Sequence, residues 1–412
     1  MKCIINAEGV ISQSLEGPLA THIGSFSERV GELGYALDSL KKQVRIAAFF
    51  SRWLGQRAIP LRDISSEHAV QFLQYRARRS LLHKGDAAAL RRLIEFLTRQ
   101  AAIPIQEMLP AKLTSAEHCA QAYEQYLREA RALARATIIN YAPFVRSFLN
   151  DRFGDGRVTL SRLRACDVVR FVQRQAPRLH TKRAKLMTSA LRSFLQYARY
   201  RGEVTLDLAA AVPAVANWSM TSIPRAIAAD QVRRLLASID RRTARGRRDY
   251  AILLLLARLG LRSGEVAFLE LDDIDWNAAQ LSVRGKSGQR GELPLSAEVG
   301  QAITAYLRRG RPHSASRRVF LRARAPIRGF LGPSGVGSIV RHALIRAGVT
   351  APTHGAHQFR HGLATEMLRR GASLGEIGAV LGHRHPQTTK IYAKVDLQAL
   401  RTLALPWPGG AR

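Results

Sequence analysis

The C-terminal half of the chain carries a set of side chains that together suit the chemistry of a phosphodiester. In chain order they are Arg262, Lys286, His357, Arg360, His383 and Tyr392. Arginine forks bind phosphate oxygens bidentately and keep their charge, histidine and lysine supply further donors, and a tyrosine hydroxyl can act as a nucleophile. Each residue alone is more simply explained as a surface charge or a satisfied polar group. Their occurrence in one order within one domain favours a joint role.

The sequence around these residues predicts the elements that position them. Arg262 follows an apolar helix that stops at Gly260, so packing would orient its fork. Lys286 lies among the glycines of a predicted hairpin turn. His357 and Arg360 are three residues apart and therefore share one face of a helix.

This set of residues resembles the tyrosine recombinase (phage integrase) family over about residues 225 to 400. The matching positions are the family's first arginine (Arg262), its hairpin lysine (Lys286), its His-x-x-Arg pair (His357 and Arg360), its His/Trp position (His383) and its nucleophile (Tyr392). The departures are small. Phe359 stands where the family commonly has leucine, and Ala393 follows the tyrosine where a histidine is frequent. All six catalytic positions are filled, so the resemblance implies an active enzyme.

The resemblance implies a reaction in which Tyr392 attacks the DNA backbone, leaving a 3′-phosphotyrosine and a free 5′-hydroxyl. Arg262 and Arg360 would clamp the phosphate, and Lys286 would protonate the leaving oxygen. Because the protein–DNA ester keeps the bond energy, rejoining would require no ATP, metal or other cofactor. Glu265, one helical turn from Arg262, is expected to orient the site groups rather than to titrate.

A metal site is the competing interpretation of the histidines. His357 and His361 have the i, i+4 spacing that can bind zinc, and His354 lies nearby. However, the sequence has no H-E-x-x-H pattern, and a zinc ion on His357 would remove a phosphate donor. The prediction is therefore that the site holds no metal.

The charge of the chain independently indicates a polyanionic partner. The 412 residues include 64 Lys and Arg against 31 Asp and Glu, a formal net charge of +33, and nucleic acid is the commonest partner of such chains. An anionic membrane is the competitor, but the longest apolar run, 251–257, is far short of the roughly 20 residues that a spanning helix needs. The first residues do not form a credible secretory signal, and three scattered cysteines predict neither disulfides nor a cysteine-based zinc site. We expect a cytoplasmic protein.

The predicted fold class is mainly α with a small β-sheet or hairpin in the catalytic domain (α+β). Basic amphipathic helices fill about residues 30–212, and β-like runs at 281–284 and 292–295 flank the hairpin turn. Asp230 is a candidate N-cap for the first helix after the linker. The predicted segments are an N-terminal helical DNA-binding module (1–110), a helical core-binding domain like the SAM-like domain of the family (115–212), a linker (213–226), the catalytic domain (227–400) and a tail (401–412).

The two N-terminal segments also resemble each other. Phe49 aligns with Phe144 and Trp53 with Phe148, and further apolar positions follow at a slowly drifting offset. Residues 1–110 are therefore interpreted either as a duplicate of the core-binding module or as an arm-site binding domain. Chance similarity between two basic helical bundles is the third interpretation.

The functional prediction is a site-specific recombinase that acts as a homotetramer on paired double-stranded DNA sites, for integration, excision or transposition of a mobile element. The alternatives are a chromosome-dimer resolving recombinase, a type IB topoisomerase-like enzyme, and a non-catalytic DNA-binding protein. Accessory DNA-bending proteins or sister recombinases are the further partners that this class implies.

Overall fold

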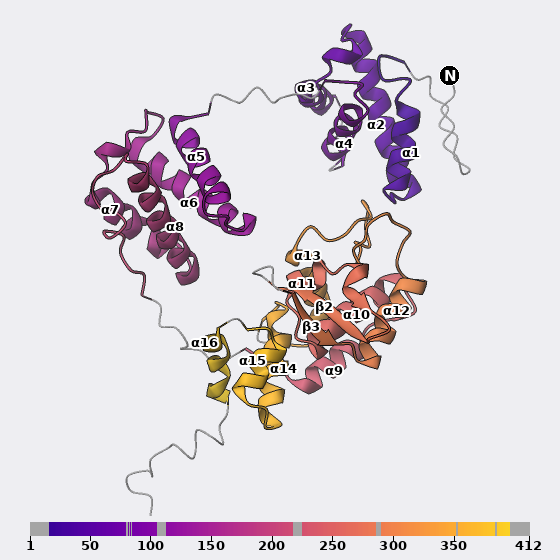
Figure 1. Cartoon of the computed structure of the whole chain (residues 1–412). Helices are drawn as coiled ribbons and strands as arrows, with labels where there is room; N and C mark the ends of the chain where they lie inside the picture. The colour runs from indigo at the N-terminus through magenta and orange to yellow at the C-terminus, as the bar shows by residue number, and fades with distance from the viewer. Residues whose placement is uncertain are drawn as a thin grey trace, which may run out of the picture. The chain divides into compact units, whose positions relative to one another are not determined.

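The computed structural model describes residues 16–79, 81, 83, 85–104, 113–216, 225–285, 290–351, 353–383 and 385–395. Contacts within the chain divide it into two compact units, residues 106–221 and the remainder. The described part is mostly helical with one small sheet (Figure 1), which confirms the predicted fold class. None of the described helices is long and apolar enough to cross a bilayer.

The N-terminal helices form a bundle with its own hydrophobic core. They are α1 (Ile23–Glu32), α2 (Leu37–Gln56), the 3-10 turn η1 (Leu61–Asp63), α3 (Ser66–Ala77) and α4 (Asp86–Arg99). Aromatic side chains dominate the centre, where Phe50 stacks on Trp53 and both rings contact Phe72. Ser65 caps α3, because its hydroxyl accepts a hydrogen bond from the backbone N–H of His68.

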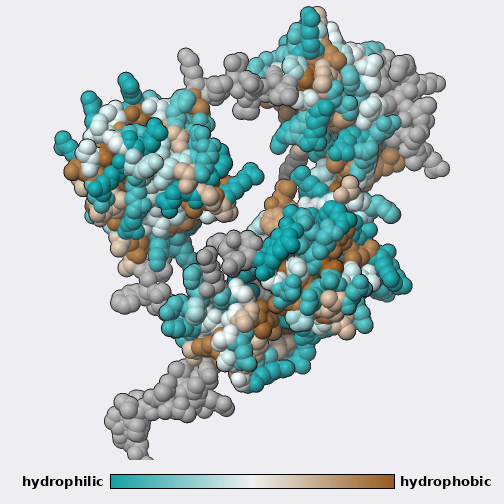
Figure 2. All heavy atoms as spheres, viewed as in Figure 1, coloured by the Kyte–Doolittle hydropathy of each residue, from teal (hydrophilic) through white to brown (hydrophobic). Residues whose placement is uncertain are grey.

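The unit formed by residues 106–221 is a second helical bundle. Its elements are α5 (Ser115–Glu129), α6 (Arg135–Phe153), η2 (Leu160–Arg162), α7 (Ala165–Gln175), η3 (Ala176–Arg178) and α8 (Thr181–Tyr200). A capping box between Thr114 and Glu117 starts α5, and Gly154, with φ +58°, ends α6. Hydrophilic residues cover much of the visible surface of this bundle (Figure 2), as expected when its apolar residues pack inward.

The C-terminal part holds the remaining elements. They are α9 (Ala229–Ala237), α10 (Ala244–Arg258), α11 (Ser263–Ala267), η4 (Leu271–Asp273), β1 (Ile274–Asp275), β2 (Gln280–Arg284), β3 (Arg290–Pro294), α12 (Ala297–Arg309), α13 (Pro333–Arg346), α14 (His357–Arg369), α15 (Leu374–Val380), α16 (Pro386–Thr389) and η5 (Lys390–Val395). The expectation that Asp230 caps the first helix is wrong. Ala228 is the N-cap, and its backbone N–H donates to the side chain of Gln231, so Asp230 lies inside the first turn.

The sheet is antiparallel, in the order β1-β2-β3. The predicted hairpin is β2–β3, with Arg284 opposite Arg290 next to the turn and Gln280 opposite Pro294 at the open end. Strand β1 adds only two residues. Four of the five residues between β2 and β3, 286–289, lie outside the described residues.

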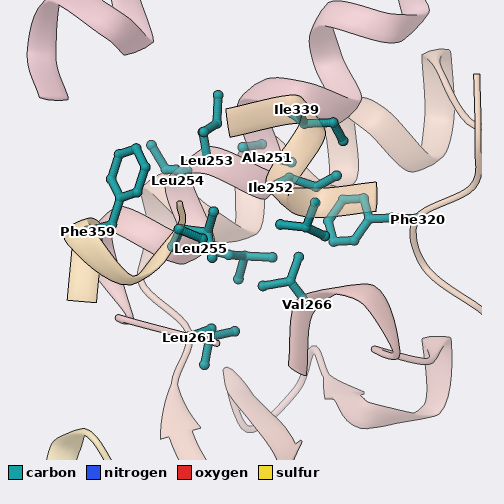
Figure 3. Close-up of a cluster of buried hydrophobic side chains, with 14 of the residues drawn as sticks. Ala251, Ile252, Leu253, Leu254, Leu255, Leu261, Val266, Phe320, Ile339 and Phe359 are labelled. Carbon is teal, nitrogen blue, oxygen red and sulfur yellow. The ribbon is translucent and has the colours of Figure 1, made fainter. Parts of the chain in front are cut away.

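The core of the C-terminal part surrounds α10. The run Ala251 to Leu256 is buried on every side of this helix, which explains why its sequence shows no amphipathic period. Figure 3 shows Ala251 to Leu255 of this run together with Phe320 from the segment between α12 and α13, Ile339 of α13 and Phe359 of α14. The first turn of α14 is thereby fixed on the core, which sets the position of the residues that follow Phe359.

A separate small cluster holds the last elements together. It consists of the buried residues Ala364, Ile377, Leu381 and Tyr392. The predicted tail, 401–412, and most of the predicted linker lie outside the described residues, and the proposed domain boundaries stay a prediction.

Candidate active site

Arg262 is held by a carboxylate one helical turn away. It is the N-cap of α11, its backbone N–H donates to Glu265 Oε2 at 2.7 Å, and its Nη1 donates to Glu265 Oε1 at 2.6 Å. The Glu265 side chain is 6% exposed and the Arg262 side chain 31%. The buried carboxylate thus fixes both the backbone and the fork of Arg262, while other guanidinium N–H groups remain accessible to solvent.

Arg360 is buried and tied to two distant segments. Its Nη1 donates to the carbonyl of Gly260 at 2.8 Å, and its Nη2 donates to the carbonyl of Leu381. Gly260 has φ +61°, and an added Cβ would lie 2.9 Å from Leu381 Cδ2, so this close approach requires glycine. Burial and the neighbouring Arg262 lower the pKa of Arg360 to about 10. The guanidinium therefore stays charged at neutral pH.

Tyr392 is 1% exposed, and its hydroxyl has a hydrogen-bond partner in the residue that follows Arg360. The tyrosine hydroxyl lies 3.0 Å from His361 Nδ1, and the two rings are 5.7 Å apart. Burial raises the pKa of Tyr392, although the positive charges of Arg360 and Arg262 oppose this rise. The resting tyrosine is therefore a protonated phenol.

His361 is kept neutral. Burial, then the nearby His357 and Arg360, lower its pKa. A neutral imidazole has one nitrogen able to accept a hydrogen bond, so with the protonated phenol as donor, His361 Nδ1 is the acceptor.

His383 lies parallel to the ring of Tyr392. The ring centroids are 6.5 Å apart with an interplanar angle of 4°, and His383 Nδ1 lies 2.8 Å from the hydroxyl of Thr389. Burial, followed by the charges of Arg360 and Arg262, lowers the pKa of His383 to about 4. When the Thr389 hydroxyl donates this hydrogen bond, the Nε2 nitrogen of His383 carries the proton and can donate to a ligand.

A cleft of about 830 Å³ collects several of these groups. Its lining includes Arg262, Glu265, Arg360, His383 and the hairpin residue Arg290. Three of the guanidinium N–H groups of Arg360 remain after its two carbonyl bonds, because arginine has five donors. The cleft can therefore present two cationic forks and a histidine to one anionic group. Tyr392 and His361 are not part of the cleft lining as described.

The structure brings together five of the six predicted catalytic residues. Arg262, Arg360, His383 and Tyr392 interact as given above, and His357 begins α14 with its ring centroid 6.5 Å from that of His361. The His357 side chain is exposed. Lys286 lies outside the described residues, but Gly285 and Arg290 on either side of it line the cleft. Its place at the site stays a prediction.

The sequence did not predict the hydrogen-bond partners of His383 and Tyr392, which are Thr389 and His361. His361 was considered only as a possible zinc ligand. Its position next to Arg360 on a predicted helix could have indicated that it lies near the site. Thr389 carried no signal, because its contact with His383 depends on the turn between them. Among the described residues, no group of three or more His, Cys, Asp or Glu side chains could hold a metal ion.

Comparison with known proteins identifies the class. The model of the phage integrase family matches residues 225–399, and that of the phage integrase N-terminal SAM-like domain matches residues 120–202. The chain is 61% identical over 412 residues to "Putative integrase/recombinase y4rA" of Sinorhizobium fredii, covering 100% of both chains. It is 31% identical over 307 residues to tyrosine recombinase XerD of Mycobacterium tuberculosis, covering 70% of this chain and 96% of that one. The chain belongs to the phage integrase family of tyrosine-type site-specific DNA recombinases.

Solved structures support the fold. The XerH site-specific recombinase bound to its palindromic difH substrate has a TM-score of 0.56 at 19% identity, covering 84% of this chain and 99% of that one. A lambda integrase dimer bound to a core site has a TM-score of 0.53 at 16% identity, covering 67% and 94%. The predicted recognition and fold class are confirmed.

Proposed function

We propose that this recombinase cleaves and rejoins double-stranded DNA at specific sites through a 3′-phosphotyrosine formed on Tyr392. The observation that carries the proposal is the joint placement of two clamped arginines and a histidine in one cleft, with a buried tyrosine stacked on that histidine. The first arginine is fixed by Glu265 and the second by two backbone carbonyls. Such preorganised donors stabilise charge that develops on phosphate oxygens.

In the proposed reaction, each step forms one bond to phosphorus and breaks one. The Tyr392 oxygen bonds to phosphorus, the bond from phosphorus to the 5′ oxygen breaks, and the phenolic proton passes to His361 Nδ1, its hydrogen-bond acceptor. Lys286 protonates the departing 5′ oxygen. In the reverse step, a partner strand's 5′-hydroxyl attacks the phosphotyrosine and Tyr392 leaves. Each step conserves the number of phosphodiester bonds, so neither ATP nor a metal is consumed.

Exchange between two sites requires four active sites, one for each strand that is cut. We therefore assign the chain to a homotetramer on paired DNA sites, an arrangement seen for a lambda integrase tetramer bound to a Holliday junction. Integration, excision or transposition of a mobile element is the role favoured by the full-length similarity to a protein named integrase/recombinase. Resolution of chromosome dimers is the second candidate, favoured by the similarity to XerD over 70% of the chain.

The test is covalent trapping. The wild-type protein and a Tyr392→Phe variant are incubated with nicked duplexes from the flanks of the gene, with chelator present, and separated on denaturing gels. An adduct that forms only with Tyr392 supports the proposal. Equal adduct with the phenylalanine variant, or a requirement for Mg²⁺, would contradict the tyrosine mechanism.

A further inference from the structure

The N-terminal bundle and the second bundle have the same order of elements. In each, a helix is followed by a long helix, a three-residue 3-10 turn, and further helices. The long helices α2 and α6 have 20 and 19 residues, and η1 and η2 follow them at similar distances. Order alone is weak evidence, because many small bundles share it.

The turns before α3 and α7 agree in their hydrogen bonds. At α3 the backbone N–H of Ser65 donates to the side chain of His68 at 3.1 Å, and at α7 the N–H of Arg164 donates to that of Asp167 at 3.0 Å. Both pairs occupy the N-cap and third positions of their helices. One offset in numbering relates η1 to η2 and the first pair to the second.

The ends of α4 and α8 agree bond for bond. The N–H groups of residues 100, 101 and 102 donate to the carbonyls of residues 96, 98 and 97, and those of residues 201, 202 and 203 donate to residues 197, 199 and 198. Ala101 and Gly202, at the same place in this pattern, both have positive φ, +52° and +71°. An alanine in the left-handed region is uncommon. Its match to a glycine indicates a common backbone and not a common preference for residue type.

The cores agree as well. Trp53 packs on Phe72 at 5.7 Å between centroids, and the aligned pair Phe148 and Phe171 packs at 5.3 Å. In the last helices, the buried residues Ala89, Leu90, Leu93 and Leu97 align without gaps to the buried residues Ala190, Leu191, Phe194 and Ala198. Chain reversals of the same pattern also end α13 and α14. Duplication is therefore indicated by the matched turns before α3 and α7, the matched aromatic pair and the aligned buried positions.

We propose that residues 16–104 are a second copy of the SAM-like module and provide a second surface for duplex DNA. This inference rests on the proposed function, because the first copy is the region matched by the integrase SAM-like family model. Both copies are basic. Residues 16–104 contain 14 Lys and Arg against 8 Asp and Glu, and residues 113–216 contain 17 against 8. A polyanion that runs along both modules would offset this charge.

Three exposed cations lie on α2 and α4 of the first copy. Lys42 and Arg45 are exposed and three residues apart on one face of α2. Arg91 is exposed on α4, the helix whose Arg92 donates to Gln43 of α2. Within the described ranges, these three cations have no carboxylate oxygen within 4.0 Å, in contrast to Arg29, Arg52 and Arg62. They are therefore available to contact phosphates.

The test compares two triple variants of the full-length chain in a Tyr392→Phe background. The surface variant is Lys42→Glu/Arg45→Glu/Arg91→Glu. The control, Arg29→Glu/Arg52→Glu/Arg62→Glu, makes the same change in net charge at arginines that already have carboxylate partners. Affinity for a labelled 60-bp mixed-sequence duplex is measured between 0.05 and 0.3 M KCl, and thermal unfolding confirms that both variants fold.

The proposal predicts that the surface variant binds DNA at least about tenfold more weakly than the parent. The slope of the logarithm of the binding constant against the logarithm of the salt concentration should become shallower by about 0.9 for each lost phosphate contact. The control variant should lose less than about threefold in affinity for the duplex. An unchanged surface variant would overturn the proposal, and so would equal losses in both variants, which would reflect net charge alone. Covalent trapping with Tyr392 restored separates this outcome from failure of the proposed function, since adduct formation does not depend on where the first module lies on DNA.

Discussion

The Tyr392 hydroxyl and His361 Nδ1 are 3.0 Å apart, and this contact joins η5 to α14. His361 follows Arg360 directly, so the hydrogen-bond partner of Tyr392 and an arginine that lines the cleft share one turn of helix. Any shift of this turn therefore moves the partner of the proposed nucleophile and the proposed phosphate ligand together.

Replacing His361 with phenylalanine should slow cleavage at pH 7 by about a hundredfold or more, the usual size of a general-base contribution. The wild-type rate should level off above the lowered pKa of His361, whereas the variant rate should keep rising with pH as the tyrosine ionises unaided. Single-turnover adduct formation between pH 5.5 and 9 measures both profiles. His354→Phe, at an exposed histidine, is the control, and parallel pH profiles for His361→Phe and wild type would refute the role.

Glu265→Gln should reduce cleavage by about tenfold to a hundredfold with little change in DNA affinity. The amide cannot balance the charge of Arg262 or accept both of its hydrogen bonds, and a charge-assisted hydrogen bond contributes about 1.5–3 kcal/mol. Glu298→Gln removes the same charge from an exposed ion pair with Arg258 and should leave the rate unchanged. Equal effects of the two variants on adduct formation would show that Glu265 does not position Arg262.

Gly260→Ala should lower both stability and cleavage. The positive φ disfavours a side chain by about 1–2 kcal/mol, and the new Cβ would press on Leu381 and Leu363, displacing a carbonyl that holds Arg360. Gly348→Ala has the same backbone strain at φ +59° with nothing within 4 Å. Urea unfolding should show a larger loss for Gly260→Ala, and the adduct assay should show a loss for that variant alone. An equal loss of adduct formation in Gly348→Ala would contradict the idea that Gly260 acts by holding Arg360.

The stability of the catalytic domain should fall as the pH drops from about 6.5 toward 4. His383 and His361 have lowered pKa values in the folded state, about 4 for His383, so the unfolded chain binds these protons first. Their contribution is complete above the unfolded pKa of about 6.5 and is lost as the pH falls through the folded values. Unfolding midpoints at pH 7 and 5 measure the drop. His383→Gln should lose less stability over this interval than wild type does, and an unaltered drop would contradict the prediction.

The sequence predicted what depends on local pattern. Amphipathic and apolar periods located the helices, and two β-like runs around a glycine-rich turn located the β2–β3 hairpin. Strand β1 was missed because two residues carry no alternation, and Asp230 was misplaced because a good capping residue also suits the first turn. Ala101 and Gly202 correspond in backbone conformation, since both have positive φ. An alanine and a glycine give no such indication in the sequence.

The chemistry of the site was predictable only in part, for a related reason. Residue types and order predicted phosphate ligands and a nucleophile, which stay predictions, but the contacts that hold these residues are long-range. The carbonyls of Gly260 and Leu381 that bind Arg360 belong to segments 100 and 21 residues away. Every residue has a backbone carbonyl, so the sequence does not show which carbonyls accept hydrogen bonds from Arg360.

Tyr392 is also one of the four buried residues of the small cluster that joins α14, α15 and η5. Exposing a ring of this size costs on the order of 2 kcal/mol, close to a thirtyfold bias toward the inward position. Tyr392, the proposed nucleophile, therefore also stabilises this cluster. If the ring must turn outward to reach a phosphate, binding to DNA has to supply that free energy.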